Sequence, residues 1–212
     1  MSKKKEIKEK AISLFNEKGI STVTMRQIAE SLSISPGNLT YHYKTKDALV
    51  QIIYQQLHDE SSDYISFDGY LTLNDFEIIL KRFYELRKRY SFFFNDIVFI
   101  NRQFPVVAEM YQTANISRFR RSRRLVDYFV ATDRMIPENE FIDYSKLIHS
   151  IWMINTFWPS QSQIMSSNDY PVNRTTPIDI SWQLLFPYLS EKGREEYTQI
   201  RKFVDNNIHT KQ

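Results

Sequence analysis

The chain has 212 residues, of which 42% are hydrophobic, enough for one large domain or for a small domain joined to a larger one. It has no cysteine, which excludes disulfide bonds, thiolate metal sites and cysteine nucleophiles. Its first lysines precede no apolar run, and no stretch approaches the roughly 18 apolar residues of a membrane helix. We therefore expect a soluble, cytoplasmic protein without a signal peptide.

The net charge of +3 is unevenly distributed along the chain. Residues 1–50 carry nine Lys or Arg against five Asp or Glu, whereas the remainder carries 19 against 20. A basic head on a near-neutral body suits contact with phosphates by one end of the molecule, although a solvated lysine-rich surface explains the same excess. Only 4 glycines and long periodic stretches favour an all-α fold over a sandwich or barrel.

The first predicted helix covers about residues 4–18. Four apolar residues recur there at helical spacing and form one stripe: Ile7, Ala11, Leu14 and Phe15. Gly19 supplies a left-handed stop, and Ile20 can pack back on the last turn.

The second helix starts at Thr24, and Gln27 three residues later completes a capping box. Its predicted buried face consists of Met25, Ile28, Ala29 and Leu32. Ser33 and Ile34 form the next turn. A third short helix follows, capped by Ser35, with Pro36 at its first position, where a missing N–H group has no cost.

Longer helices are expected after this point. Thr45 caps a fourth helix that continues to about residue 65, with the apolar stripe Leu49, Ile52, Ile53 and Leu57. The further predicted helical segments are 74–90, 92–104, 105–133, 141–165 and 178–207. Pro159 should kink or end the fourth of these, residues 160–176 should form a loop, and the last should break near Pro187.

Residues 24–46 thus read as two short helices around a tight turn, followed by the start of another helix. In a helix-turn-helix, the second short helix needs an inward anchor and an outward face that reaches bases and phosphates. Leu39 and Tyr43 are four residues apart and should point inward. Gly37 then lets the backbone approach DNA, and Asn38 can pair with a base edge, usually adenine.

The neighbouring polar groups suit phosphate contacts. Thr40 offers a methyl and a hydroxyl group, whereas Tyr41 and His42 can donate hydrogen bonds to phosphate oxygens. Thr24 and Lys46 each lie at a helix N-terminus, where free N–H groups favour an anion. The candidate DNA-binding residues are Thr24, Arg26, Ser35, Pro36, Gly37, Asn38, Thr40, Tyr41, His42 and Lys46.

This pattern resembles the TetR family of transcriptional regulators over about residues 5–50. The runs AISLFNEKGISTVTMRQIAESLSIS and SPGNLTYHYKTKDAL carry the resemblance. It implies an all-α dimer with an N-terminal three-helix DNA-binding domain, residues 1–48, and a larger helical ligand-binding and dimerisation body, residues 49–212. By position, the resemblance makes Thr24 and Lys46 phosphate contacts and matches Gly37, Asn38, Tyr41 and His42 to recognition-helix positions. Many members have Tyr in place of Thr40 and Phe in place of Tyr43.

A helical bundle that binds nothing would show similar caps and stripes. Gly37 and the adjacent Tyr41 and His42 argue against that alternative, because packing alone would not select them for an exposed helix face. A protein that coats DNA without sequence preference is a further alternative, and it would bind scrambled DNA equally well.

The body is rich in aromatic residues, which suit either an ordinary core or an apolar cavity between helices. The candidate effector-pocket residues are Phe83, Phe99, Tyr111, Phe119, His149, Trp152, Asn155 and Trp158. Asn155 and His149 could orient a ligand, although His149 also suits a plain core or surface position. Residues 118–124 carry five arginines. Three interpretations are open: a solvated helix face, a binding site for an anionic ligand, or a second contact with DNA far from the N-terminal helices.

No enzyme motif is present. The sequence contains no HExxH, GxSxG, P-loop or GxGxxG pattern, and we therefore expect no catalytic residues, no metal and no cofactor. A lipid-binding or enzymatic helical module that kept a regulatory-looking head is the remaining alternative, which turnover of a bound ligand would reveal.

The sequence therefore predicts a ligand-responsive repressor. A homodimer would place two recognition helices on a palindromic operator of double-stranded DNA, and a small hydrophobic or amphipathic effector would release it. Residues 141–158 and the C-terminal helices should form the dimer contact, although their apolar stripes suit intramolecular packing as well.

Overall fold

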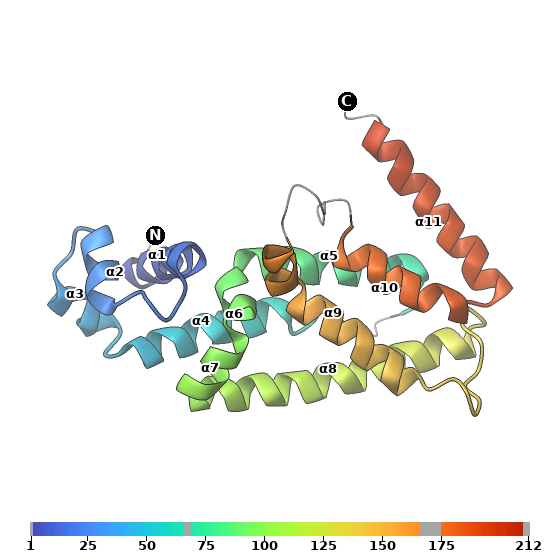
Figure 1. Cartoon of the computed structure of the whole chain (residues 1–212), viewed down its shortest axis with the longest axis horizontal. Coiled ribbons are helices and arrows are strands. Elements are labelled where there is room, and N and C mark those ends of the chain that lie inside the picture. Colours follow the sequence, from blue (N-terminus) through green and yellow to red (C-terminus); the bar gives the residue numbers. More distant parts are fainter. Residues whose placement is uncertain (1, 66–68, 166–174, 210–212) are drawn as a thin grey trace. The chain divides into compact units, whose positions relative to one another are not determined.

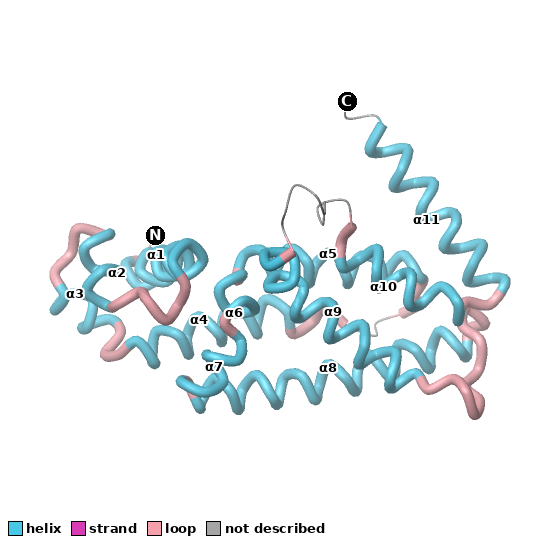
Figure 2. The backbone as a smooth tube through the Cα atoms, viewed as in Figure 1, coloured by secondary structure: helices cyan, strands magenta, loops and turns pink. Residues whose placement is uncertain are grey.

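The computed structural model describes residues 2–65, 69–165 and 175–209, and these residues form helices without a sheet (Figures 1 and 2). The all-α fold class is thus confirmed. The N-terminal helices are α1 (Lys3–Lys18), α2 (Met25–Ser31), α3 (Pro36–His42) and α4 (Lys46–Ser61). The following helices are α5 (Leu73–Arg89), α6 (Ser91–Asn95), α7 (Ile97–Gln103), α8 (Pro105–Ala131), α9 (Tyr144–Ile164), α10 (Pro177–Leu185), the short 3-10 helix η2 (Phe186–Tyr188) and α11 (Glu191–His209).

The chain divides into two compact units. Unit 1 consists of Met1–Asp63 and Leu86–Asn115, and unit 2 consists of Tyr64–Glu85 and Ile116–Gln212. Helices α5 and α8 each contribute residues to both units. No helix in the described part of the chain combines the length and the apolar character needed to cross a membrane.

Unit 1 is built around the predicted stripe of α1. Its side chains are buried together with Ile20, which follows the helix end at Gly19, where φ is +80°. Helix α4 buries residues at spacings of one, three and four: Leu49, Val50, Ile53, Tyr54 and Leu57. That stripe leaves out Ile52, which is 44% exposed, so its predicted burial is wrong. Met25 and Leu32, at the two ends of α2, are also only half-buried.

Two predicted boundaries of the longer helices are wrong. The segment 92–104 forms two helices because Asp96 leaves the helical conformation, with φ −105° and ψ 21°. Helix α9 ends at Ile164, close to the end predicted for the segment 141–165, but it continues through Pro159, so the start of the predicted loop at residue 160 is wrong. The rest of the predicted loop lies mostly outside the described residues. The break near Pro187 is confirmed, because η2 separates α10 from α11.

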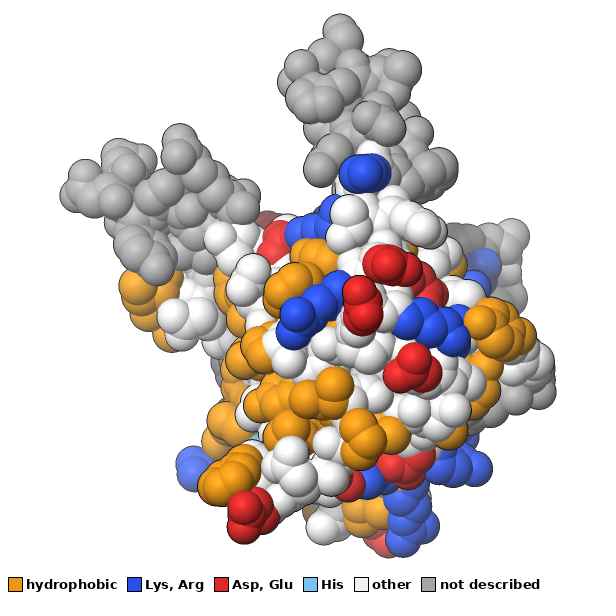
Figure 3. Space-filling model, turned by 90° about the vertical axis from the view of Figure 1, so that its right-hand side faces the viewer, with side chains coloured by type: hydrophobic (Ala, Val, Ile, Leu, Met, Phe, Trp, Pro, Cys, Tyr) orange, Lys and Arg blue, Asp and Glu red, His pale blue; other side chains and the backbone are white. Residues whose placement is uncertain are grey.

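Unit 2 has its own aromatic and aliphatic core around Trp182, which is 1% exposed. Its indole N–H donates to the buried carboxylate of Glu77 on α5. The buried Arg134 pairs with Glu196 at 2.7 Å and so ties the α8–α9 connection to α11. Figure 3 shows hydrophobic side chains gathered on one part of the face that it presents, beside intermixed acidic and basic residues.

Candidate nucleic-acid interface

Local hydrogen bonds fix both short helices of the motif. The Thr24 hydroxyl accepts from the Gln27 N–H at 3.2 Å, and the Gln27 side chain accepts from the Thr24 N–H at 2.8 Å. The Ser35 hydroxyl accepts from the Asn38 N–H at 3.1 Å, with Pro36 at the first helical position. The predicted capping box and the predicted cap of α3 are confirmed.

The turn between α2 and α3 is tight. Ser33 has φ +53°, in the left-handed region that few side chains adopt. The Ile34 N–H donates to the Ala29 carbonyl at 3.1 Å, which closes the end of α2. The predicted turn at Ser33 and Ile34 is confirmed, and it brings α3 into contact with α2.

The inward face of α3 is anchored as predicted. Leu39 is fully buried and Tyr43 is 6% exposed. The Tyr43 hydroxyl donates to the Lys4 carbonyl at 3.2 Å, which links the end of α3 to α1. Burial raises the pKa of the Tyr43 phenol, so this donor stays protonated at neutral pH.

The outward face of α3 is exposed over Pro36, Gly37, Asn38, Thr40 and Tyr41. Tyr41 is 85% exposed, and its ring stands edge-on to that of His42 at 5.2 Å. An aromatic side chain so far from any core has no packing role, and its phenol is available to a partner.

Two polar side chains on this surface already have partners within the head. The Thr40 hydroxyl lies 3.1 Å from the Pro36 and Gly37 carbonyls, so mainly its methyl group faces outward. Arg26 on α2 pairs with Glu30 at 2.8 Å, and this hydrogen bond raises the pKa of the guanidinium. The spacing of four residues was a readable signal for the pair, which the sequence prediction missed.

Lys46 has an unexpected environment. Its ammonium group donates to the Val23 carbonyl at 2.7 Å and to the Ile20 carbonyl, and it lies 5.7 Å from the centre of the Phe15 ring. Burial lowers its pKa, with a smaller opposing effect from Asp47. The ammonium therefore holds the loop between α1 and α2 and retains one further N–H to donate.

The candidate effector residues fall into both units. Phe99 and Tyr111 belong to unit 1 and pack against Phe104 and Phe93, respectively. The other six belong to unit 2: Phe83, Phe119, His149, Trp152, Asn155 and Trp158. Phe83 packs edge-on to Tyr64 at 5.1 Å, and Trp158 is half-buried.

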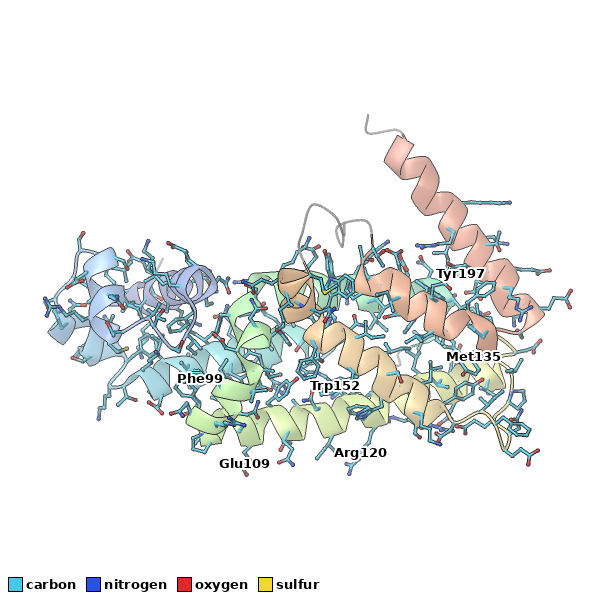
Figure 4. All side chains as sticks on the ribbon, viewed as in Figure 1. Phe99, Glu109, Arg120, Met135, Trp152 and Tyr197 are labelled. Carbon is cyan, nitrogen blue, oxygen red and sulfur yellow. The ribbon has the colours of Figure 1, made fainter. Side chains whose placement is uncertain are left out.

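Three of these side chains form an aromatic cluster between α8 and α9. Phe119, His149 and Trp152 have ring centroids 5.6 to 5.8 Å apart, and His149 is exposed. Trp152 of this cluster is labelled in Figure 4. Asn155, in contrast, is buried and donates a hydrogen bond to the Ser181 hydroxyl of α10 at 2.7 Å. Its amide therefore joins two helices, a packing role that the sequence did not indicate.

Two family models match this chain and together span most of it. Residues 7–53 match the model described as bacterial regulatory proteins of the tetR family, and residues 53–197 match the TetR model described as a bacterial transcriptional repressor. The chain belongs to the TetR family. TetR proteins are transcriptional regulators that bind DNA as dimers and are not enzymes.

Individual relatives agree with this assignment. A probable HTH-type transcriptional regulator, YttP of Bacillus subtilis (strain 168), is 32% identical over 59 residues, a match that spans 28% of either chain. A TetR-family regulator from Marinobacter aquaeolei VT8 has the same fold, with a TM-score of 0.85 at 24% identity over 95% of this chain and 98% of its own. The SmeT–triclosan complex is more distant, with a TM-score of 0.62 at 15% identity over 89% of this chain and 92% of its own.

Proposed function

We propose that this TetR regulator is a homodimeric repressor that binds a palindromic operator and is released by a small hydrophobic or amphipathic effector. The observation that carries the proposal is the exposed edge of α3, where Gly37, Asn38 and Tyr41 face outward while Leu39 and Tyr43 anchor the helix. An edge of this composition, on a helix whose inner face is fixed, suits the major groove.

Each candidate DNA-binding residue has a role in this proposal. Asn38 reads a base edge, Gly37 allows close approach, and Tyr41 donates to a phosphate. Thr40 presents its methyl group to the groove. The remaining residues fix register on the DNA backbone through their polar groups or through the helix N-termini: Thr24, Arg26, Ser35, Pro36, His42 and Lys46. Arg26 would exchange Glu30 for a phosphate, because an exposed pair of this kind is worth little in water.

We assign DNA binding to residues 1–48, and effector binding and dimerisation to residues 49–212. The exposed apolar side chains of α9 support a dimer contact on that helix: Met153, Phe157 and Ile164. A chromosomal operator places the protein in the cytoplasm.

The aromatic cluster of Phe119, His149 and Trp152 supports an effector with aromatic or aliphatic groups, and the related fold of SmeT carries triclosan.

Selection of bound sequences from random duplex DNA tests the operator. The proposal expects an enriched palindrome whose half-site centres lie about 34–36 Å apart, or a multiple of that distance. Failure to enrich any sequence, with equal affinity for scrambled DNA, would favour a protein that coats DNA without preference.

A thermal-shift screen against hydrophobic and amphipathic compounds tests the effector. A true effector raises the melting temperature and also weakens operator binding, because it favours one conformer over the other. Compounds that raise the melting temperature without changing operator affinity would contradict the repressor-release mechanism.

A further inference from the structure

Helix α1 meets the junction of α5 and α6 through one side-chain amide. The Asn16 Oδ1 atom accepts hydrogen bonds from the Phe92 backbone N–H at 2.9 Å and from the Ser91 hydroxyl at 3.0 Å. Its Nδ2 group donates to the Arg89 carbonyl at 2.9 Å. Because one backbone partner is an N–H group and the other is a carbonyl, only one of the two possible orientations of the side-chain amide forms both hydrogen bonds.

The backbone partners of Asn16 are groups that helix ends leave without partners. Arg89 is the last residue of α5, and Phe92 is the second residue of α6. The residue before α6, Tyr90, provides no side-chain cap. Asn16 therefore caps both helix ends from 73 to 76 residues away in the sequence.

The opposite end of α6 is also tied to α1. The Asp96 carboxylate, directly after α6, accepts a hydrogen bond from the Ile20 N–H at 3.3 Å. Between these two polar contacts, the buried rings of Phe15 and Phe92 lie 5.2 Å apart. The last turn of α1 and the residues that follow it thus hold α6 at both of its ends.

Charged groups extend this contact to α4. The Arg89 guanidinium pairs with Glu9 of α1 at 3.2 Å and with Glu60 of α4 at 3.1 Å. The buried Tyr90 hydroxyl donates to the same Glu60 carboxylate at 2.9 Å. The Arg89 pairs are partly exposed and Asn16 is an exposed residue as well, so each contact contributes modestly, and together they restrain the same helices in the same arrangement.

We propose that Asn16 is a positioning residue for operator recognition, which holds α1, and with it the recognition helix α3, on α6. It acts through α1, because α1 contacts α2 and α2 in turn contacts α3, and each of these helices has a fully buried side chain: Phe15, Ile28 and Leu39. The inference rests on the proposed function, because it concerns how firmly each head of a dimer is held. A firmly held head accepts one half-site spacing, whereas a loosely held head accepts several at an added cost in ordering.

The test compares operator spacings. The operator obtained from random-sequence selection is prepared in its original form and with one base pair inserted at its centre, which displaces one half-site by about 3.4 Å and rotates it by about 35° about the DNA axis. Full-length wild type, Asn16→Ala, Asp96→Ala and Ser13→Ala are titrated against both duplexes. Ser13→Ala is the control, since Ser13 is an exposed α1 residue outside this contact. Circular dichroism checks that each variant folds, and Asp96→Ala tests the other end of α6 should Asn16→Ala not fold.

We expect wild type and Ser13→Ala to bind the lengthened operator at least about tenfold more weakly than the original. For Asn16→Ala that ratio should fall below about threefold, and affinity for the original operator should also fall because the loosened head must be ordered on binding. An unchanged ratio, or an equal loss on both duplexes, means a merely structural role and overturns the inference. Wild type that prefers neither duplex over scrambled DNA would instead overturn the proposed function on which the inference rests.

Discussion

Lys46 holds the fold together at the place where we propose a contact with phosphate. Its ammonium group donates hydrogen bonds to the carbonyls of Ile20 and Val23. Val23 directly precedes Thr24, which caps α2. A lysine in this place orders the loop that presents the N-terminus of α2. Any phosphate that it binds would therefore approach a group already held by the protein.

Replacing Lys46 by Met should lower the free energy of unfolding by about 1–3 kcal/mol, because two carbonyls lose a charged donor while an unbranched side chain of similar length is kept. Urea unfolding measures this loss, and Lys44→Met, at an exposed neighbouring position, is the control. If Lys46 also contacts a phosphate, the variant's plot of log affinity against log salt should be shallower by about one unit. Equal stability of the two variants would contradict the role assigned to Lys46 in the fold.

Residue-scale contacts were predictable only where they are local. The caps by Thr24, Ser35 and Thr45 depend on an N–H group three residues away, and all three are formed. The contacts of Asn16 and Lys46 join residues 23 to 76 positions apart. No periodic pattern in one helix encodes such a partner, because it depends on how several helices pack.

At the scale of the element, α3 combines a stable anchor with a weak helix former on its outer face. Gly37 is the second residue of α3, and an added Cβ there would meet no atom closer than 3.9 Å. The fold thus has room for a side chain at this position. A glycine that packing does not require suggests that a partner needs the space.

Gly37→Ala should therefore raise the free energy of unfolding by up to about 1 kcal/mol, because alanine is the better helix former and fits without strain. The same variant should bind the operator several-fold more weakly, since the methyl group separates the backbone from the groove. Chemical unfolding and a DNA titration measure the two effects. A variant that gains stability and keeps full operator affinity would show that close approach at Gly37 is not needed.

Helix α9 shows why the low helix propensity of proline misplaced the start of the predicted loop at residue 160. A proline inside a helix costs about 3 kcal/mol, which favours an end at Pro159. Yet Asn155 and Thr156, in the preceding turn, are buried, and the Asn155 amide donates to Ser181 of α10. These tertiary contacts hold the helix on its neighbour, and it continues to Ile164.

For the whole molecule, the exposed side of α9 is the surface most relevant to assembly. The side chains of Met153 and Phe157 are 47% and 39% exposed. Ile164, two helical turns after Phe157, is 79% exposed. An exposed apolar stripe on one helix is typical of a protein–protein contact. It supports the dimer contact predicted for residues 141–158, within which Phe141 is 87% exposed.

Phe157→Glu should shift the protein from dimer to monomer, because two like charges would face each other across a twofold contact. Sedimentation equilibrium measures the mass, and operator affinity should fall together with dimer content. Arg120→Glu, at an exposed position of α8, controls for a negative charge away from this surface (Figure 4). A Phe157→Glu protein that remains a dimer would place the contact elsewhere.

At this scale the sequence predicted the class of the molecule better than its interior. Periodicity and caps were enough for an all-α chain with a helix-turn-helix head. The pocket residues were chosen by type, and the structure places Phe99 and Tyr111 in unit 1 and the other six in unit 2. Whether aromatic side chains line a cavity or fill a core depends on the arrangement of helices, which composition does not encode.

Base preference at the Asn38 contact tests the central claim most directly, namely that the outer edge of α3 reads DNA. Wild type and Asn38→Ala are titrated against the selected operator with each base pair changed in turn. We predict that the variant loses discrimination at one position in each half-site, by about 1–3 kcal/mol, and keeps the wild-type profile elsewhere. An Asn38→Ala protein with the wild-type profile at every position would contradict the claim.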